Sequence, residues 1–318
     1  MGKADKDNLK KIWSNYYLFI LLAGVMVISS FMHEAFLTAN NLANVFGSNV
    51  TTVLIAIGMF AVILTGGIDL SVGPVVALSS SLLAGFLQAG YPAWLSILII
   101  LIAMLIPGLI SGTLIAYGKI APIMATLAMM TIVRGIAYIY ATGSSRIITN
   151  KTILYLGSGK ISGIPVPIII LFVYFIPCWI LFNKTRFGRQ LYAIGGNQTA
   201  AYLSGVSVKK NLVLAYVFSS FTAGLTGIVL AGRLMMGAPI FGEGYEMDAI
   251  ASIVIGGASL SGGSGLVRNV LLGAFVLGLI TNVLNLVGLS SYFQMVVKGL
   301  IILGAVLGAY FFNRDKII

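Results

Sequence analysis

Ten long apolar stretches, separated by short polar segments, dominate this sequence and restrict the folds open to it. They cover residues 16–32, 50–64, 74–87, 94–117, 122–140, 166–182, 212–231, 249–260, 270–287 and 292–312. Hydrophobic residues make up 59% of the 318 residues and charged residues only 8%, against about 25% charged residues in a typical soluble domain. A water-soluble domain of this composition would expose large apolar patches. We therefore expect an all-α polytopic membrane protein with about ten transmembrane helices.

The lengths of the stretches predict that some of these helices are broken. A helix that crosses a bilayer needs about 20 apolar residues. Three stretches, at 50–64, 74–87 and 249–260, are too short to span comfortably alone. The ten stretches use nearly the whole chain, so residues 1–318 are expected to form a single membrane domain.

The distribution of basic residues predicts an orientation. If the N-terminus lies inside and the stretches alternate, thirteen basic residues fall on inside loops and only Arg146, Lys151, Lys160 and Arg233 on outside loops. Cytoplasmic loops of membrane proteins carry an excess of Lys and Arg. We therefore expect both termini in the cytoplasm and interpret the net charge of +11 as topology, with no nucleic-acid partner. The inside residues are Lys3, Lys6, Lys10, Lys11, Lys119, Lys184, Arg186, Arg189, Lys209, Lys210, Arg268, Arg314 and Lys316.

Two glycine-rich segments share the pattern G-G-x-x-L-S-x-G, at 66–73 and 256–263. They lie 190 residues apart, one in each half of the chain, which suggests an internal two-fold repeat. In transporter folds, short Gly-interrupted spans at corresponding places mark the substrate path near the bilayer midplane. The alternative is that these glycines serve helix packing alone, as the G-x-x-x-G pair Gly108 and Gly112 does most simply. The candidate path residues are Gly66, Gly67, Asp69, Ser71, Gly256, Gly257, Ser259 and Ser261.

Asp69 is the acidic residue of this set, and a carboxylate at the bilayer centre is costly. We favour a helix cap, in which Asp69 or Ser71 caps the helix that opens near Pro74. A proton relay or a sugar ligand is the alternative. Asp248 allows the same interpretation, at the start of the stretch from Ala249.

A short helix is predicted within the long inside loop, 183–211. Asn197 is a preferred N-cap residue and Gly205 a preferred C-terminal residue, and about two helical turns fit between them. A short capped helix held by two spans is a rigid handle on which a soluble partner could push. The alternative is an ordinary interfacial helix lying on the membrane.

We find no pattern that predicts catalysis or metal binding. The chain has one cysteine, Cys178, and one histidine, His33, too few for a thiol cluster or a His-based site. The segment 157–161 hints at a phosphate-binding loop, but the motif requires Gly at 154 and Ser or Thr at 161, where this chain has Leu154 and Ile161. The chain is therefore not expected to be an enzyme.

Several motifs, in order along nearly the whole chain, resemble one family. They are LTGGIDLSVG at 64–73, TRFGR at 185–189, YAIGGN at 192–197, AA at 200–201 with LSG at 203–205, GYEMDAIA at 244–251, GGASLSGG at 256–263 and SSYFQM at 290–295. The chain resembles the permease subunit of bacterial ribose-type monosaccharide ABC importers. On this resemblance, residues 1–318 form one transmembrane permease domain in the bacterial cytoplasmic membrane, and 183–211 is its cytoplasmic coupling loop.

The resemblance implies a set of partners. The permease is a dimer, usually of identical chains; a periplasmic or lipid-anchored binding protein delivers a small sugar; and cytoplasmic ATPase modules drive alternating access. ATP and Mg²⁺ are held by that ATPase, so this chain itself carries no cofactor. The coupling helix corresponds to 197–205, with Asn197, Ala200, Ala201, Leu203 and Gly205 as coupling residues. A glutamate often precedes the two alanines in other importers, and this chain has Thr199 there, so charge pairing with the ATPase is not expected at that point.

Three alternatives stay open. An ion-coupled secondary transporter requires ionisable residues deep in the spans, and only Asp69 and Asp248 qualify. A membrane enzyme or scaffold requires a clustered polar site that we do not find in the sequence. The same importer type could also carry a nucleoside or a sugar-like signal.

Overall fold

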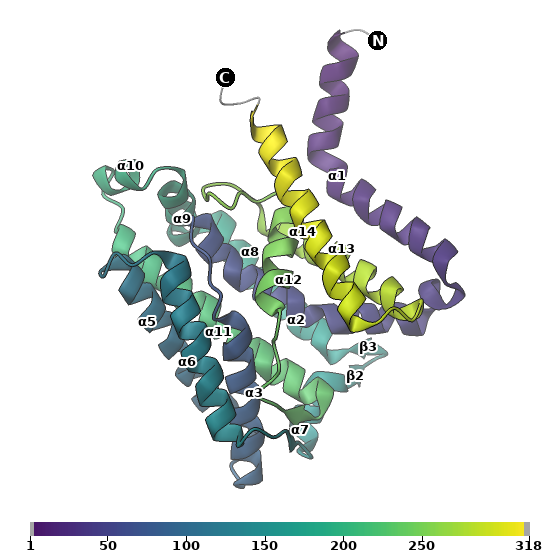
Figure 1. Cartoon of the computed structure of the whole chain (residues 1–318), viewed down its shortest axis with the longest axis vertical. Helices are drawn as coiled ribbons and strands as arrows, with labels where there is room; N and C mark the ends of the chain where they lie inside the picture. The colour runs from purple at the N-terminus through teal and green to yellow at the C-terminus, as the bar shows by residue number, and fades with distance from the viewer. Residues whose placement is uncertain (1–2, 315–318) are drawn as a thin grey trace.

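The computed structural model describes the backbone of residues 3–314 and the side chains of residues 16–304 and Leu307. The basic side chains before residue 16, and those of Arg314 and Lys316, lie outside the described part, although the orientation argument counts them. The described chain is mainly helical, with four strands of two residues each (Figure 1). The elements, in chain order, are α1 (Lys3–Met32), η1 (Glu34–Leu37), α2 (Ala39–Leu64), α3 (Val72–Gln88), α4 (Ala93–Ala103), α5 (Leu105–Ala116), α6 (Pro122–Ala141), β1 (Arg146–Ile147), α7 (Lys151–Ser158), β2 (Lys160–Ile161), β3 (Ile164–Pro165), α8 (Val166–Lys184), α9 (Arg186–Gly196), α10 (Gln198–Leu203), α11 (Val208–Leu234), β4 (Met236–Gly237), α12 (Tyr245–Ile255), α13 (Val267–Leu286) and α14 (Ser291–Arg314).

Each of the ten apolar stretches overlaps a helix, as predicted. Six helical segments are long and apolar enough to cross a membrane: α2, α4 with α5, α6, α8, α11 and α13. Residues 16–32 of α1, α3 and residues 291–304 of α14 form shorter apolar helices. The helices therefore describe a multi-pass membrane protein, and the number of ten crossings stays a prediction.

The sequence prediction of a short second span was wrong. Helix α2 begins at Ala39, eleven residues before the apolar stretch, and is 26 residues long. Its first turn is capped by Thr38, whose Oγ1 accepts a hydrogen bond from the N–H of Asn41 at 3.3 Å. The second half of α2 is buried in protein, whereas Asn40 and Asn44 of its first half are exposed. The other two short spans are confirmed, since α3 has 17 residues and α12 has 11.

The fourth stretch is one span with a break. Helices α4 and α5 meet at Met104, three residues before Pro107. A proline has no backbone N–H for the carbonyl four residues earlier, and its ring pushes that carbonyl aside. That carbonyl is the one of Ala103, and the carbonyl of the next residue, Met104, accepts a hydrogen bond from Ser220 Oγ of α11 at 2.5 Å. The break is therefore also a contact with the central helix.

Helix α11 lies at the centre of the fold and packs against α2, α3 and α5. The pattern Gly108–Gly112 forms a close crossing with α11, as predicted: a Cβ at Gly108 would lie 2.8 Å from Ser220 Cβ, and one at Gly112 would lie 2.8 Å from Val213 Cα. Only glycine allows two backbones to approach this closely. The crossing fixes α5 against the centre of the molecule.

The loop between α2 and α3 lies halfway along α11. Asp69 contacts Ser219, near the middle of that 27-residue helix. Residues 235–244 turn back along α3: Gly237 packs against Ala84 and Gly242 against Val76. Helix α12 therefore begins beside the start of α3, where Gly242 and Glu246 lie against Gly73, and not at the end of a full span. Helices α3 and α12, which begin inside the helical bundle, are therefore the broken helices that the sequence predicts.

The two ends of the molecule carry different elements. Helices α9 and α10 lie at the same end as the start of α1 and the end of α14, whereas α7 and β2 lie toward the opposite end (Figure 1). At that opposite end, β1 pairs with β4 in an antiparallel ladder, Arg146 with Gly237 and Ile147 with Met236. The two loops that the sequence assigns to the outside, 143–165 and 232–247, are thus joined to each other.

Candidate functional site

The two glycine-rich segments end their helices with the same backbone geometry. Gly66 and Gly257 have φ of +81° and +78°, a left-handed conformation that costs glycine little. In each case the next residue donates its N–H to the carbonyl five residues back: Gly67 to Val62 at 3.2 Å and Ala258 to Ile253 at 3.1 Å. This is the Schellman arrangement of a helix C-terminus. The structural equivalent of Gly66 is therefore Gly257 and not Gly256, one residue away from the sequence match, and the two-fold repeat stays a prediction.

The same two segments meet each other and the C-terminal end of α9. The N–H of Gly263 donates to the Leu64 carbonyl at 2.9 Å. A Cβ at Gly262 would lie 2.7 Å from Gly66 N, and one at Gly263 would lie 2.7 Å from Gly196 N. We call this meeting point of residues 64–66, 195–196 and 262–263 the glycine junction. It connects the segment that carries α10 to both glycine loops through backbone contacts.

One side chain reinforces the glycine junction. The hydroxyl of Tyr192, on α9, donates to the Gly265 carbonyl at 2.8 Å. Burial raises the pKa of Tyr192 above its ordinary value, because a buried phenolate would lose its hydration. The phenol therefore stays protonated and remains a donor at physiological pH.

Asp69 is buried, with 1% of its surface exposed, and three hydrogen bonds hold its carboxylate. Oδ1 accepts from the N–H of Ser71 at 3.0 Å and from its Oγ at 2.6 Å, and Oδ2 accepts from Ser219 Oγ at 2.8 Å. Ser71 precedes α3 but makes no side-chain cap bond, so the expectation that Ser71 caps α3 was wrong. Asp69 lies two residues before Ser71, and its carboxylate closes an Asx turn with the Ser71 N–H. The bond from Ser219 also joins the loop to α11.

The remaining candidate path residues lie in the two loops without forming one cavity. Gly66 and Gly257 are exposed, Gly67 and Gly256 are buried, Ser259 is half-buried and Ser261 is exposed. Neither of the two pockets described below is lined by any of these residues or by Asp69 and Ser71. Their assignment to the substrate path stays a prediction.

The predicted short helix of the 183–211 loop is present as α10, with six residues. Asn197 is its N-cap, and the Oδ1 of Asn197 accepts from the N–H of Ala200 at 2.9 Å. Gly205 follows with φ of +82°. Ala201 is buried in a small apolar cluster with Ile194, Val208 and their neighbours.

Two large side chains are exposed at the C-terminal end of α10. Leu203 and Tyr202 are 79% and 70% exposed, and Asn197, Ala200 and Gly205 are also exposed. Helix α10 thus carries two large exposed side chains while Ala201 anchors its other face.

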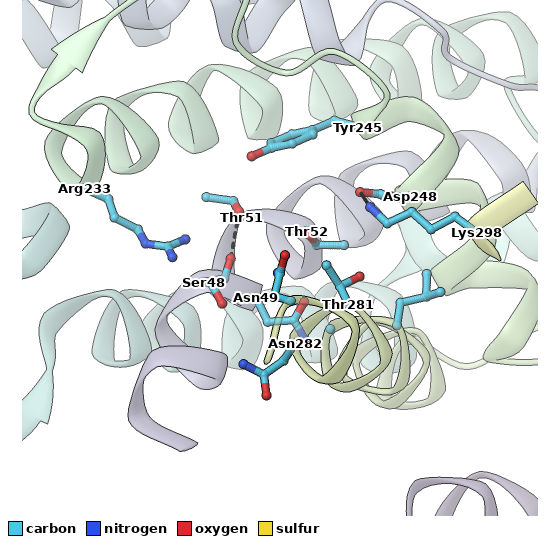
Figure 2. Close-up of a pocket in the computed structure, with 13 residues that line it drawn as sticks. Ser48, Asn49, Thr51, Thr52, Arg233, Tyr245, Asp248, Thr281, Asn282 and Lys298 are labelled. Atoms are coloured by element: carbon cyan, nitrogen blue, oxygen red, sulfur yellow. Dashed lines mark hydrogen bonds and ion pairs between the residues drawn. The ribbon is translucent and has the colours of Figure 1, made fainter. Parts of the chain in front are cut away.

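A polar pocket of about 240 Å³ lies between α2 and α13. Its walls are residues 48–52 of α2 and 277–285 of α13, and Arg233, Tyr245, Asp248 and Lys298 complete it. Figure 2 shows Arg233 and the Asp248–Lys298 pair on opposite sides of the space, with Tyr245 facing Thr281 and Asn282 across it. Of the thirteen lining residues, only Leu277 and Gly278 lack a polar side chain. This is the most polar interior region that the pockets reveal.

A second pocket of about 390 Å³ adjoins the first. Asn40 and Asn44 of α2 and Lys160 of β2 line it, and Ser48 and Arg233 line both pockets. Lys160 belongs to β2, toward the end that carries α7, so the second pocket reaches toward that end.

Asp248 does not cap α12, contrary to the sequence expectation. The helix begins at Tyr245, after Gly244 with φ of +76°, so Asp248 lies in its first turn. Its Oδ2 forms an ion pair with Lys298 Nζ at 2.9 Å. Both side chains are partly exposed within the pocket, at 19% and 28%.

Sequence analysis missed the pocket residues of α2 and α13, although a signal exists. Asn41, Asn44, Ser48 and Thr52 recur at intervals of three or four, which places them on one helix face. Thr281, Asn282 and Asn285 form a similar cluster within the apolar stretch 270–287. A search for apolar spans treats the first group as a loop and overlooks the second.

The chain belongs to a family of transport permeases. A family model described as "Branched-chain amino acid transport system / permease component" matches residues 41–306. The chain is 45% identical to the ribose import permease protein of Bacillus subtilis, over 91% of this chain and 89% of that protein. It is 39% identical to the ribose import permease protein of Haemophilus influenzae, over 94% of each chain. The D-allose transport system permease protein of Escherichia coli is 36% identical over 94% of this chain and 92% of its own length. No solved structure gives a significant match.

Proposed function

We propose that this chain is the membrane-spanning subunit of an ABC importer that carries a small sugar, ribose first, into a bacterial cell by alternating access. The relatives named for ribose and D-allose support a monosaccharide. The polar pocket is the structural observation that carries the choice of substrate class.

The pocket favours a sugar over a branched-chain amino acid, the substrate in the printed family description. An aliphatic side chain needs apolar surface to pack against, and Leu277 is the single large aliphatic side chain in the lining. Amide, hydroxyl and charged groups instead match the alternating donors and acceptors of a polyol. Among sugars, the identities of the relatives favour ribose, with a nucleoside or a sugar-like signal as the alternatives.

The exposed face of α10 is proposed to dock a separate ATPase subunit, which binds ATP and Mg²⁺ and drives the cycle. Asn197, Ala200, Ala201, Leu203 and Gly205 form and present this helix. A second permease chain, identical in the simplest case, and a sugar-binding protein at the opposite end complete the importer. On this proposal the permease itself performs no hydrolysis.

The proposed location is the bacterial cytoplasmic membrane, with both termini and the 183–211 loop in the cytoplasm. Two observations support it: the excess of basic residues on the assigned inside loops, and the grouping of α10 with the described ends of α1 and α14 at one end of the molecule (Figure 1). In the transport cycle, ATPase closure would move α10 and, through the glycine junction, the loops at 66–73 and 256–263.

The test is co-expression of the chain with the ATPase and binding protein of its own operon, followed by reconstitution in liposomes. We expect uptake of D-ribose that requires ATP. In the variant Leu203→Glu, uptake should be lost because the apolar docking face is charged, whereas Ser207→Glu, exposed beyond α10, should retain it. Uptake driven by an ion gradient without ATP would instead support the secondary transporter, with Asp69 and Asp248 as the coupling carboxylates.

A further inference from the structure

The pocket between α2 and α13 has hydrogen-bonding groups that the described protein leaves unused. Thr52, Thr281 and Arg233 all line it, and the described residues provide no hydrogen-bond partner for any of these three side chains. Asp248 uses Oδ2 for Lys298 and keeps Oδ1 available. Thr52, Arg233 and Thr281 are half-buried, so their free hydrogen-bonding groups are accessible from the pocket and can bind a polar occupant there.

Other lining groups are fixed by the protein and give the pocket a defined shape. Asn49 donates to the Ala274 carbonyl at 2.9 Å, Asn282 exchanges hydrogen bonds with Asn41 at 2.9 and 3.0 Å, and Asn285 accepts from Gln294 at 2.8 Å. These bonds orient the walls before any ligand arrives. A preorganised polar site loses less free energy on binding than a flexible one.

The size and charge of the pocket restrict the ligand. A volume of about 240 Å³ is large enough for one monosaccharide. The pocket has a balanced ion pair and one additional cation, Arg233. A neutral polyol can accept from Arg233 and Lys298 and donate to Asp248, since charged groups form the stronger hydrogen bonds.

We propose that this pocket is a sugar-holding site inside each permease chain, which binds one neutral monosaccharide such as ribose beside the second pocket, with which it shares Ser48 and Arg233. Tyr245 offers one ring face to the sugar, and Thr52 and Thr281 bind its hydroxyls. This inference rests on the proposed function. What it adds is that each permease chain binds its own sugar molecule within its helical bundle, and not solely at a contact between two chains.

The first test uses the single native cysteine, which is buried and can be replaced by alanine. In that background, Thr281→Cys places a thiol in the pocket, and Thr152→Cys places one on the exposed side of α7 as a control. The purified permease is treated with N-ethylmaleimide with and without millimolar D-ribose. We expect ribose to slow the labelling of residue 281 at least fivefold and to leave residue 152 unaffected. Equal labelling of residue 281 with and without ribose would overturn the proposal.

The second test measures transport by the reconstituted importer. The double variant Thr52→Val and Thr281→Val keeps the side-chain shape and removes two hydroxyls, which should lower ribose uptake per ATP hydrolysed about tenfold. Thr131→Val is the matched control, because Thr131 is exposed on α6 and its hydroxyl bonds its own helix. Unchanged uptake by a folded double variant would refute the site. If the wild type transports no ribose with ATP while ribose still protects residue 281, the proposed function fails and the binding site stands.

Discussion

Replacement of Gly195 by alanine gives the sharpest test of the glycine junction. Gly195 lies in the last turn of α9, where a Cβ would overlap the Leu64 carbonyl oxygen and Gly263 N and would lie 3.0 Å from the carbonyl carbon of Gly262. These are backbone atoms, so no side chain can rotate away to make room. Its neighbour Gly196 is a matched control, because nothing lies within 4 Å of a Cβ there.

The magnitude follows from three contributions. Overpacking costs about 1–3 kcal/mol, and separation of the Gly263–Leu64 hydrogen bond adds about 0.5–1.5 kcal/mol. Alanine returns up to about 1 kcal/mol of helix propensity, and this gain applies equally to Gly196→Ala. The two variants should therefore differ in stability by about 1.5–4.5 kcal/mol, the sum of the first two terms.

Both variants are to be assayed as the reconstituted importer. We expect Gly195→Ala to lower the apparent Tm and to hydrolyse ATP with much less ribose uptake, because α9 no longer contacts the loops at 64–66 and 262–263. Gly196→Ala should behave like the wild type in both measurements. If Gly195→Ala matches Gly196→Ala in Tm and in uptake per ATP, the reasoning about the junction is refuted.

Two further substitutions probe individual polar contacts. Asp69→Asn leaves one acceptor oxygen where the carboxylate has two, so Ser219 Oγ must either turn to accept from the new amide or lose its bond. Thermal unfolding should show a destabilisation of about 1–3 kcal/mol, and an unchanged Tm would contradict this view of Asp69. Asn197→Ala removes the cap bond to the Ala200 N–H, which destabilises α10 alone by about 1 kcal/mol. ATPase co-purification should therefore weaken while the Tm of the permease is unchanged. Undiminished co-purification would argue against α10 as the docking element.

Local features of the fold were predictable from the sequence because local interactions determine them. The short helix α10 was predicted from Asn197 and Gly205, and both play the expected roles. Capping bonds and positive φ depend on residues within one or two turns. The α5–α11 crossing was likewise indicated by Gly108 and Gly112, since a small residue on every fourth position permits close packing in any membrane helix.

The beginning of α2 was not predictable from apolar runs. Hydropathy assumes that a transmembrane helix faces lipid, but 83% of the apolar window of α2 is buried in protein. Asn49, which is buried and donates to the Ala274 carbonyl, can therefore lie on this helix without contact with hydrocarbon. The equivalence of Gly66 with Gly257 was also missed, because sequence letters align Gly66 with Gly256 while hydrogen bonds define where each helix ends.

The sequence by itself determined that the chain is a helical membrane protein with interrupted spans and a capped helix in its longest basic loop. Apolar stretches, basic loops and capping residues are each formed by residues close together in the sequence, so they can be recognised from the sequence alone. Only the tertiary structure decided where polar groups meet. Arg233, Asp248 and Lys298 reach the pocket from three helices, and Asp69 finds Ser219 across 150 positions, because the packing of helices and not sequence spacing brings them together.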